Sequence, residues 1–226
     1  MISGETRLVG LVRGPLVPSL SPRMQNAAFA ARGLDWAYVP LSVRPEELEA
    51  ALRELVTMNF AGANVTTPHK LAAAQLAATD EPSVNTLVVR DGVIHGTSTD
   101  PAILRDLDFE RAAIIGDGGV AAAFAAVLPD ASRFSRRGTW PPDVVDADLV
   151  INATSERELV LVELHTGQTL VDLPYPLTAT AHAAEGAGAH VVDGLEVLVA
   201  QGAASFELWT GVAPPVDAMR AAVRSA

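Results

Sequence analysis

A glycine-rich turn between an apolar segment and a helical segment constrains the fold of this 226-residue chain more than any other feature. Residues 111–116 (RAAIIG) predict a short buried strand, and residues 120–128 predict a helix. The turn that joins them, Gly116-Asp117-Gly118-Gly119-Val120-Ala121, has the spacing G-x-G-x-x-A. A strand, a tight glycine turn and a helix in this order open a parallel, doubly wound α/β sheet.

The same turn indicates a dinucleotide cofactor, because it leaves room for a pyrophosphate at the N-terminus of the helix. Four residues of the turn are predicted to contact that cofactor: Gly116, Gly118, Gly119 and Ala121. About 20 residues past Gly116, where an acid would bind a ribose hydroxyl, the chain has Arg133, Arg136 and Arg137. Arginines favour a 2′-phosphate, hence NADP over NAD, although a solvated basic loop is the alternative.

Residues 1–105 predict a separate region of alternating strands and helices. Its predicted strands and helices cover 8–12, 23–32, 37–43, 45–58 and 61–65. Strands 85–89 and 93–96 are expected to form a hairpin across Arg90-Asp91-Gly92. The expected fold class is therefore α/β, an open α/β domain followed by a Rossmann-like domain.

The segment Asn64-Val65-Thr66-Thr67-Pro68-His69-Lys70 follows the third of these strands. Thr66 or Thr67 suits a helix N-cap and Pro68 suits the first helical position, so a helix is expected to begin there. Lys70 then lies in the first turn, where the helix dipole disfavours a cation. Ligands of open α/β sheets collect at the carboxyl ends of strands, which makes Lys70 a candidate acid/base. A solvated lysine is the alternative.

Two further segments combine hydroxyl or carboxyl groups with a proline. In Ser19-Leu20-Ser21-Pro22 the second serine is a predicted N-cap, and a helix N-terminus with two hydroxyls also suits an anion. In Ser98-Thr99-Asp100-Pro101 the aspartate is likewise a predicted N-cap, with one carboxylate oxygen left free for another role.

Taken together, these motifs resemble the shikimate dehydrogenase family. The resemblance is carried, in the family's order, by Ser19–Pro22, Asn64–Lys70, Val84-Asn85-Thr86, Thr99-Asp100, Gly194-Leu195 and Gln201. It extends over nearly the whole chain. It implies NADP-dependent, reversible reduction of 3-dehydroshikimate to shikimate, a step of chorismate and aromatic amino acid biosynthesis.

The resemblance also implies a role for individual residues. Lys70 would be the catalytic acid/base, and Asp100 would orient it. The substrate's carboxylate and ring hydroxyls would be held by Ser19, Ser21, Asn64, Thr66, Asn85, Tyr175 and Gln201. Cofactor contacts beyond the glycine turn would come from Ser135, Arg136, Arg137, Asn152, Thr154 and Gly194.

The domains expected from this resemblance are a substrate-binding and catalytic domain at 1–105 and an NADP-binding domain at 106–193. Helices in 194–226 would pack back on the first domain. Only ten residues, Gly138 to Ala147, precede the strand at 148–152, which is too few for a helix and another strand. The nucleotide domain is therefore predicted to be trimmed.

Asp117 within the glycine turn and the trimmed segment support a different class of function. A carboxylate near a pyrophosphate opposes its binding, so the chain would be a shikimate-type ligand-binding protein with impaired cofactor binding. A third possibility keeps the dehydrogenase and changes the substrate to quinate or another related cyclic carboxylate.

Composition excludes several classes of protein. The net charge is −11 and the pI about 4.8, which argues against nucleic acid or anionic membranes as partners. The chain has no cysteine, which rules out disulfides and thiolate chemistry, and its five histidines lack metal-site spacing, so no metal is predicted. No apolar run suits a membrane span or a signal peptide, and a cytoplasmic protein is expected, as a monomer or homodimer.

Overall fold

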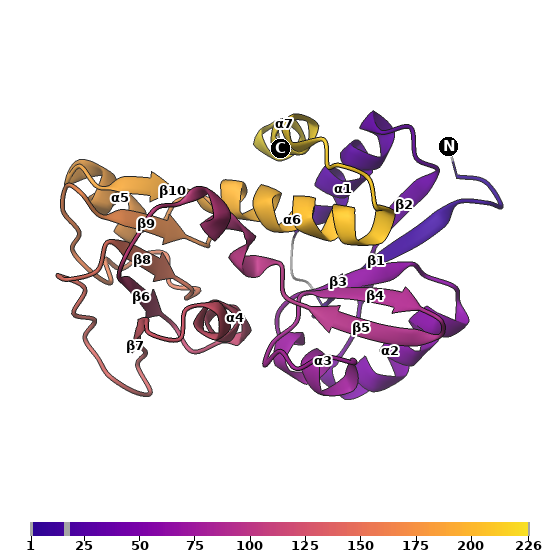
Figure 1. Cartoon of the computed structure of the whole chain (residues 1–226), viewed down its shortest axis with the longest axis horizontal. Helices are drawn as coiled ribbons and strands as arrows, with labels where there is room; N and C mark the ends of the chain where they lie inside the picture. Colours follow the sequence, from indigo (N-terminus) through magenta and orange to yellow (C-terminus); the bar gives the residue numbers. More distant parts are fainter. Residues whose placement is uncertain (1, 16–18, 226) are drawn as a thin grey trace. The chain divides into compact units, whose positions relative to one another are not determined.

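The computed structural model describes residues 2–15 and 19–225 and divides the chain into two compact units. Unit 1 comprises Met1–Asp100 and Val199–Ala226, and unit 2 comprises Pro101–Leu198. Each unit has its own five-stranded sheet with helices packed against it (Figure 1). The predicted α/β class is confirmed.

The sheet of unit 1 is mixed and has the strand order β2-β1-β3-β4-β5. Its strands are β1 (Arg7–Arg13), β2 (Trp36–Ser42), β3 (Gly62–Val65), β4 (Thr86–Arg90) and β5 (Val93–Thr97). β1 runs parallel to β2 and β3, whereas β4 is antiparallel to both of its neighbours, β3 and β5. The predicted hairpin between β4 and β5 is present, and Asp91 and Gly92 both adopt the positive φ that a two-residue hairpin turn requires.

Helices cover both faces of this sheet. They are α1 (Ser21–Ala31), the 3₁₀ helix η1 (Pro45–Glu47), α2 (Leu48–Thr57), α3 (Lys70–Leu76), α7 (Val216–Arg224) and the end of α6 (Gly194–Thr210). Figure 1 shows α2 and α3 beside each other, and Leu48, Leu52, Leu55 and Ala73 of these helices share one core cluster with Val65 of β3. α1 packs against α7, and its Phe29 ring contacts Phe206 of α6. The ends of β1, β3 and β4 are thereby fixed between two apolar layers.

Two of the helix starts predicted in unit 1 are wrong by one or more residues, whereas the helix predicted from Pro45 begins there, as η1. Leu20, not Ser21, is the N-cap of α1, and Ser21 is its first residue. α3 begins at Lys70 with His69 as N-cap. Thr66 instead closes a turn, its carbonyl accepting from His69 N at 2.9 Å. The buried His69 ring bonds to Val43 O at 3.0 Å, which fixes this turn ahead of the helix.

The sheet of unit 2 is fully parallel and has the strand order β10-β9-β8-β6-β7. Its strands are β6 (Ala112–Ile115), β7 (Ser132–Phe134), β8 (Leu149–Asn152), β9 (Thr169–Asp172) and β10 (His190–Val192). Its helices are α4 (Gly119–Val127), α5 (Ala179–Gly186), the start of α6 and most of the 3₁₀ helix η2 (Asp100–Asp106). The predicted strand, glycine turn and helix are present as β6 and α4.

The connection from β7 to β8 is short and irregular. Residues 135–148 hold neither helix nor strand, in agreement with the length argument from the sequence. The segment still contributes Val144 and Ala147 to the core of unit 2, alongside Ile115 and Val150. β7 is therefore the last strand on this side of the sheet (Figure 1).

Candidate active site

A buried ion pair lies at the centre of the site residues of unit 1. Lys70 Nζ is 2.6 Å from Asp100 Oδ2, and the two side chains are only 10% and 8% exposed. Lys70 is the first residue of α3, and Asp100 is the first residue of η2. A buried charge is tolerated only when it is paired and hydrogen-bonded, so each of these side chains depends on the other.

Asn85 connects this ion pair to α6. Its Nδ2 donates to Asp100 Oδ1 at 2.8 Å and to Gln201 Oε1 at 3.3 Å. Its Oδ1 accepts from the backbone N–H of Thr99 at 2.8 Å. Because a backbone N–H can only donate, this contact sets the amide orientation, with oxygen toward Thr99 and nitrogen toward the carboxylate. Lys70, Asp100, Asn85 and Gln201 thus lie in one hydrogen-bonded group.

Asn64 is bonded on both sides of its amide and is almost fully buried. Its Nδ2 donates to Asn85 O at 3.0 Å, and it lies 3.1 Å from both Thr86 Oγ1 and Ser205 Oγ. Its Oδ1 accepts from the Tyr38 hydroxyl at 2.8 Å. Burial raises the pKa of the Tyr38 phenol far above its usual range, so Tyr38 remains a donor.

The predicted hydroxyl ligands lie at the ends of α1 and β3. Ser19 Oγ donates to Ser21 Oγ at 3.1 Å and accepts from Ser21 N at 3.2 Å. The Tyr38 hydroxyl bonds to Asn64. Thr66 is half-buried directly after β3. A series of hydrogen bonds therefore runs from Tyr38 through Asn64 to the backbone of Asn85.

The glycine turn of unit 2 has the shape that a dinucleotide requires. Gly116 has φ +131°, and a Cβ on it would lie 2.8 Å from Ala153 O, so only glycine fits. Gly118 is the N-cap of α4, and a Cβ there would meet no atom within 4 Å. Gly119 begins the helix, and Ala121 is buried under it. Open space in front of a helix N-terminus fits a pyrophosphate.

Two of the three predicted arginines lie beside this turn and are paired with carboxylates. Arg137 Nε is 3.4 Å from Asp117 Oδ2, and Arg136 Nη2 is 3.4 Å from Glu156 Oε2. Arg136 also lies 5.7 Å from the centre of the Trp140 ring. Ser135 opens the turn that carries both arginines, its carbonyl accepting from Gly138 N at 3.0 Å. The charge of Asp117 is thus partly balanced within the protein.

The other predicted cofactor residues lie at the carboxyl end of β8 and at the start of α6. Asn152 Oδ1 accepts from Thr154 Oγ1 at 2.8 Å, and its Nδ2 donates to Asp172 Oδ1 at 2.7 Å. A Cβ on Gly194 would lie 2.5 Å from the carbonyl oxygens of Leu173 and Pro174, so glycine is required there as well. Tyr175, predicted to bind substrate, lies in unit 2 in the loop after β9.

Sequence reasoning missed several buried polar residues of these groups: Tyr38, Thr86, Asp172 and Ser205. Ser205 carried a usable signal, because it follows Gln201 by four residues and so lies on the same face of the helix. Asp172 also carried one, as a carboxylate at the end of a buried strand. The hydrogen bond of Tyr38 joins β2 to β3, and a single sequence shows no sign of it.

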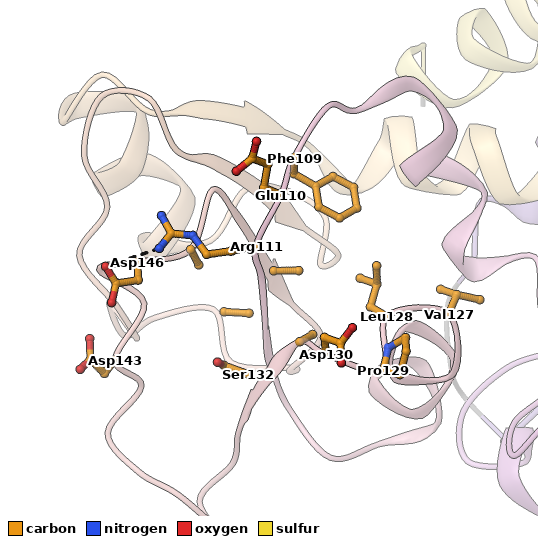
Figure 2. A pocket seen from close by; sticks show the side chains of 14 residues that line it. Phe109, Glu110, Arg111, Val127, Leu128, Pro129, Asp130, Ser132, Asp143 and Asp146 are labelled. Atoms are coloured by element: carbon orange, nitrogen blue, oxygen red, sulfur yellow. Dashed lines mark ion pairs between the residues drawn. The ribbon is translucent and has the colours of Figure 1, made fainter.

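Unit 2 also contains a cavity of about 490 Å³ at the opposite end of β6 from the glycine turn. Figure 2 shows Phe109, Leu128 and Pro129 around it, with Arg111 turned toward Asp146 at 3.8 Å. Its other charged side chains are acidic. It is therefore separate from the residues predicted to contact the cofactor.

Within residues 2–15 and 19–225, no three histidine, aspartate or glutamate side chains are grouped so as to hold a metal ion. Among the helices of the same residues, none is long and apolar enough to cross a membrane.

Comparison with known proteins identifies both ends of the chain. Residues 11–87 match the family model of the shikimate dehydrogenase substrate binding domain, and residues 194–224 match that of the shikimate 5′-dehydrogenase C-terminal domain. The NADP(+) shikimate dehydrogenase of Methanothermobacter thermautotrophicus is 35% identical over 277 aligned positions, covering 99% of this chain and 98% of the relative. The alignment has more positions than the 226 residues of this chain, so this chain has gaps opposite some residues of the relative.

Solved structures agree in fold over nearly the full length. Shikimate 5-dehydrogenase from Thermus thermophilus, crystallised with NADP(H) and shikimate, superposes with a TM-score of 0.86 at 28% identity, covering 97% of this chain and 99% of that one. Quinate dehydrogenase from Corynebacterium glutamicum, with NAD, gives 0.82 at 24% identity, covering 98% and 99%, which shows the fold alone. From its sequence identity and coverage, this chain belongs to the shikimate dehydrogenase family.

Proposed function

We propose that this protein catalyses the NADP-dependent, reversible reduction of 3-dehydroshikimate to shikimate. The observation that carries the proposal is the buried pair of Lys70 and Asp100, 2.6 Å apart and held by Asn85. Reducing a ketone to an alcohol requires a hydride at carbon and a proton at oxygen. Bound NADPH supplies the hydride.

Lys70 supplies the proton in this proposal. Its ammonium donates to the ketone oxygen as the hydride reaches the carbon, and in the oxidative direction the neutral amine takes the proton back. Asp100 keeps the ammonium in position and compensates its charge. Asn85 holds the carboxylate of Asp100 from the other side, so that one oxygen remains directed at Lys70.

The remaining substrate contacts are assigned by chemistry. Ser19 and Ser21, at the N-terminus of α1, suit the carboxylate of the substrate, because hydroxyl donors and the helix dipole both favour an anion. The ring hydroxyls are assigned to the neutral polar side chains: Asn64, Thr66, Asn85, Gln201 and Tyr175. Both ends of the Asn64 amide already bond to the protein, to Tyr38 and to the Asn85 backbone. Asn64 would therefore support substrate binding mainly by holding these neighbours in place.

The cofactor is assigned to the second domain, predicted at 106–193. Gly116, Gly118, Gly119 and Ala121 would admit the pyrophosphate. Ser135, Arg136 and Arg137 would hold the 2′-phosphate, which would replace Asp117 and Glu156 as the partner of the two guanidinium groups. Contacts farther along the cofactor are assigned to Asn152, Thr154 and Gly194.

Calorimetric titration with NADP⁺ and NAD⁺, each with and without shikimate, tests the proposal. Micromolar binding of NADP⁺, weaker binding of NAD⁺ and production of NADPH from NADP⁺ and shikimate are expected. Shikimate binding without binding of either nucleotide would instead favour a ligand-binding protein. A parallel titration with quinate decides the substrate, because tighter binding and faster turnover of quinate would overturn the assignment to shikimate.

A further inference from the structure

We propose that Ser205 is a positioning residue for this reaction, acting through Asn85 on Asp100. The inference rests on the proposed function. Ser205 lies on α6, one helical turn after Gln201, and its side chain is fully buried in unit 1. Burying a serine hydroxyl costs folding free energy unless the hydroxyl is hydrogen-bonded. The hydroxyl of Ser205 has several possible partners.

The hydroxyl of Ser205 lies within hydrogen-bonding distance of four groups. Its single proton goes to Gln201 O, 2.9 Å away, because a carbonyl can only accept. The two lone pairs of the oxygen are then left to accept from the neighbouring groups, which are Asn64 Nδ2 at 3.1 Å, Thr86 Oγ1 at 2.8 Å and Thr99 Oγ1 at 3.0 Å, two at a time. Side chains from β3, from β4 and from the loop before η2 therefore all lie within hydrogen-bonding distance of the Ser205 hydroxyl.

These contacts decide where Asn85 points. Thr86 and Thr99 hydroxyls also lie 2.8 and 3.1 Å from Asn85 Oδ1, so each shares its one proton between this oxygen and Ser205, and Thr99 N adds a third donor. With its oxygen surrounded by donors, the amide presents its nitrogen to Asp100. Ser205 holds the two threonine hydroxyls in the places that produce this arrangement. Without it, the two threonine hydroxyls can rotate, and the amide of Asn85 is held less firmly, by the backbone N–H of Thr99.

The consequence falls on the geometry of proton transfer. Asp100 receives Asn85 on Oδ1 and Lys70 on Oδ2, so a displaced amide displaces the carboxylate that positions Lys70. A small displacement of a catalytic group can cost up to about 100-fold in rate. Ser205 is not placed in contact with substrate, and its loss should therefore reduce kcat more than it weakens shikimate binding.

The test compares Ser205→Ala with Ser83→Ala. Ser83 is an equally buried serine of unit 1, and within the residues that the structure describes its hydroxyl has no hydrogen-bond partner. Ser205→Ala should lower kcat about 10-fold and change the Kd for shikimate less than about threefold. Ser83→Ala should leave both nearly unchanged. Equal effects of the two variants on kcat would overturn the proposal, because the loss of any buried serine hydroxyl would then have the same result as the loss of Ser205.

A second variant guards against misfolding of the first. Thr99→Val preserves the shape of the side chain and the backbone N–H that bonds to Asn85, but removes the hydroxyl that lies between Ser205 and Asn85 Oδ1. It should lower kcat in the same direction, and Ser205→Ala with Thr99→Val should lower it less than the product of the two single effects. Multiplicative effects in the double variant would refute the shared network.

Failure of this inference differs from failure of the proposed function. A wild-type protein that turns over shikimate with NADP⁺, combined with a Ser205→Ala variant of unchanged kcat, overturns the role of Ser205 alone. A wild-type protein that neither binds shikimate nor reduces NADP⁺ overturns both.

Discussion

Lys70 combines two features that each cost stability when taken alone. It begins a helix, where the dipole opposes a positive charge, and it is almost completely buried. Asp100 offsets both, and Asn85 and Ser98 bond to the same carboxylate. These contacts around one carboxylate hold it in place against Lys70, which suits a group that must meet a substrate oxygen in a fixed direction.

Replacing Lys70 with alanine should therefore remove turnover and leave binding. We expect Lys70→Ala to lower kcat by at least about 100-fold, as for loss of a general acid, while the Kd for shikimate changes little. Steady-state kinetics and calorimetry measure the two quantities. A raised KM with an unchanged kcat would contradict the assignment. Because Asp100 is then left buried without its cation, the melting temperature must be recorded and kinetics measured well below it.

At this scale, the sequence predicted the residues better than their connections. Short motifs of the sequence indicate Lys70, Asn85, Asp100 and Gln201, and the structure brings them into one hydrogen-bonded group. That Tyr38 bonds to Asn64 could not be predicted, because β2 and β3 are separated by more than one element and meet β1 on opposite sides. Side-chain pairing across a sheet depends on strand order and register, and no local pattern encodes either.

Among the elements, the glycine turn of unit 2 gives the most specific prediction. Asp117 lies inside this turn and is paired with Arg137, but both side chains are largely solvated, so the pair itself contributes little. Removing the carboxylate removes a negative charge near the pyrophosphate and frees the guanidinium for the 2′-phosphate. Asp117→Asn should lower the Kd for NADP⁺ about fivefold, and that for NAD⁺ less.

Asp130→Asn is the matched control for this prediction. It makes the same change in net charge on an exposed residue of unit 2, but Asp130 lines the cavity at the other end of the sheet (Figure 2). Calorimetry on both variants distinguishes a local effect from a change in overall charge. Equal gains, or an unchanged Kd in Asp117→Asn, would show that this carboxylate does not act on the cofactor.

Helices and strands were predicted in place, but two features escaped the sequence. The strand β7 has only three residues, of which Phe134 alone is buried, too short for a hydrophobic period to be detected. The starts of α1 and α3 are misplaced because serine or threonine before proline is a frequent cap signature, whereas α1 begins one residue earlier, at Ser21, and a turn precedes α3. The end residues of elements depend on tertiary contacts such as the one between His69 and Val43.

On the scale of the whole molecule, each unit has hydrophobic core residues of its own, and α6 contributes residues to both units. One cluster of buried apolar residues lies between the sheet of unit 1 and α2 with α3, and another lies within unit 2. The boundary between the units falls inside α6, after Leu198. A chain of this kind need not unfold in one step, and a ligand stabilises first the unit that binds it.

The tryptophans allow this to be measured. Trp36 and Trp209 belong to unit 1 and Trp140 to unit 2, so fluorescence of a Trp140→Phe variant reports unit 1 alone. Shikimate at 100 times its Kd should stabilise the transition seen in urea by about 2.7 kcal/mol. Benzoate, a carboxylate without ring hydroxyls, serves as the control. An unfolding midpoint that shikimate leaves in place would argue against a binding site in unit 1.

The short connection after β7 has one more consequence, for self-association. A sheet whose last strand is exposed offers its backbone groups to strands of other molecules, which is a route to aggregation. Here that strand is only Ser132–Phe134, its first two residues are exposed, and one of them is Arg133. A three-residue edge with a cation is a poor template for another strand. Unit 2 thus ends its sheet in a way that discourages intermolecular strand pairing.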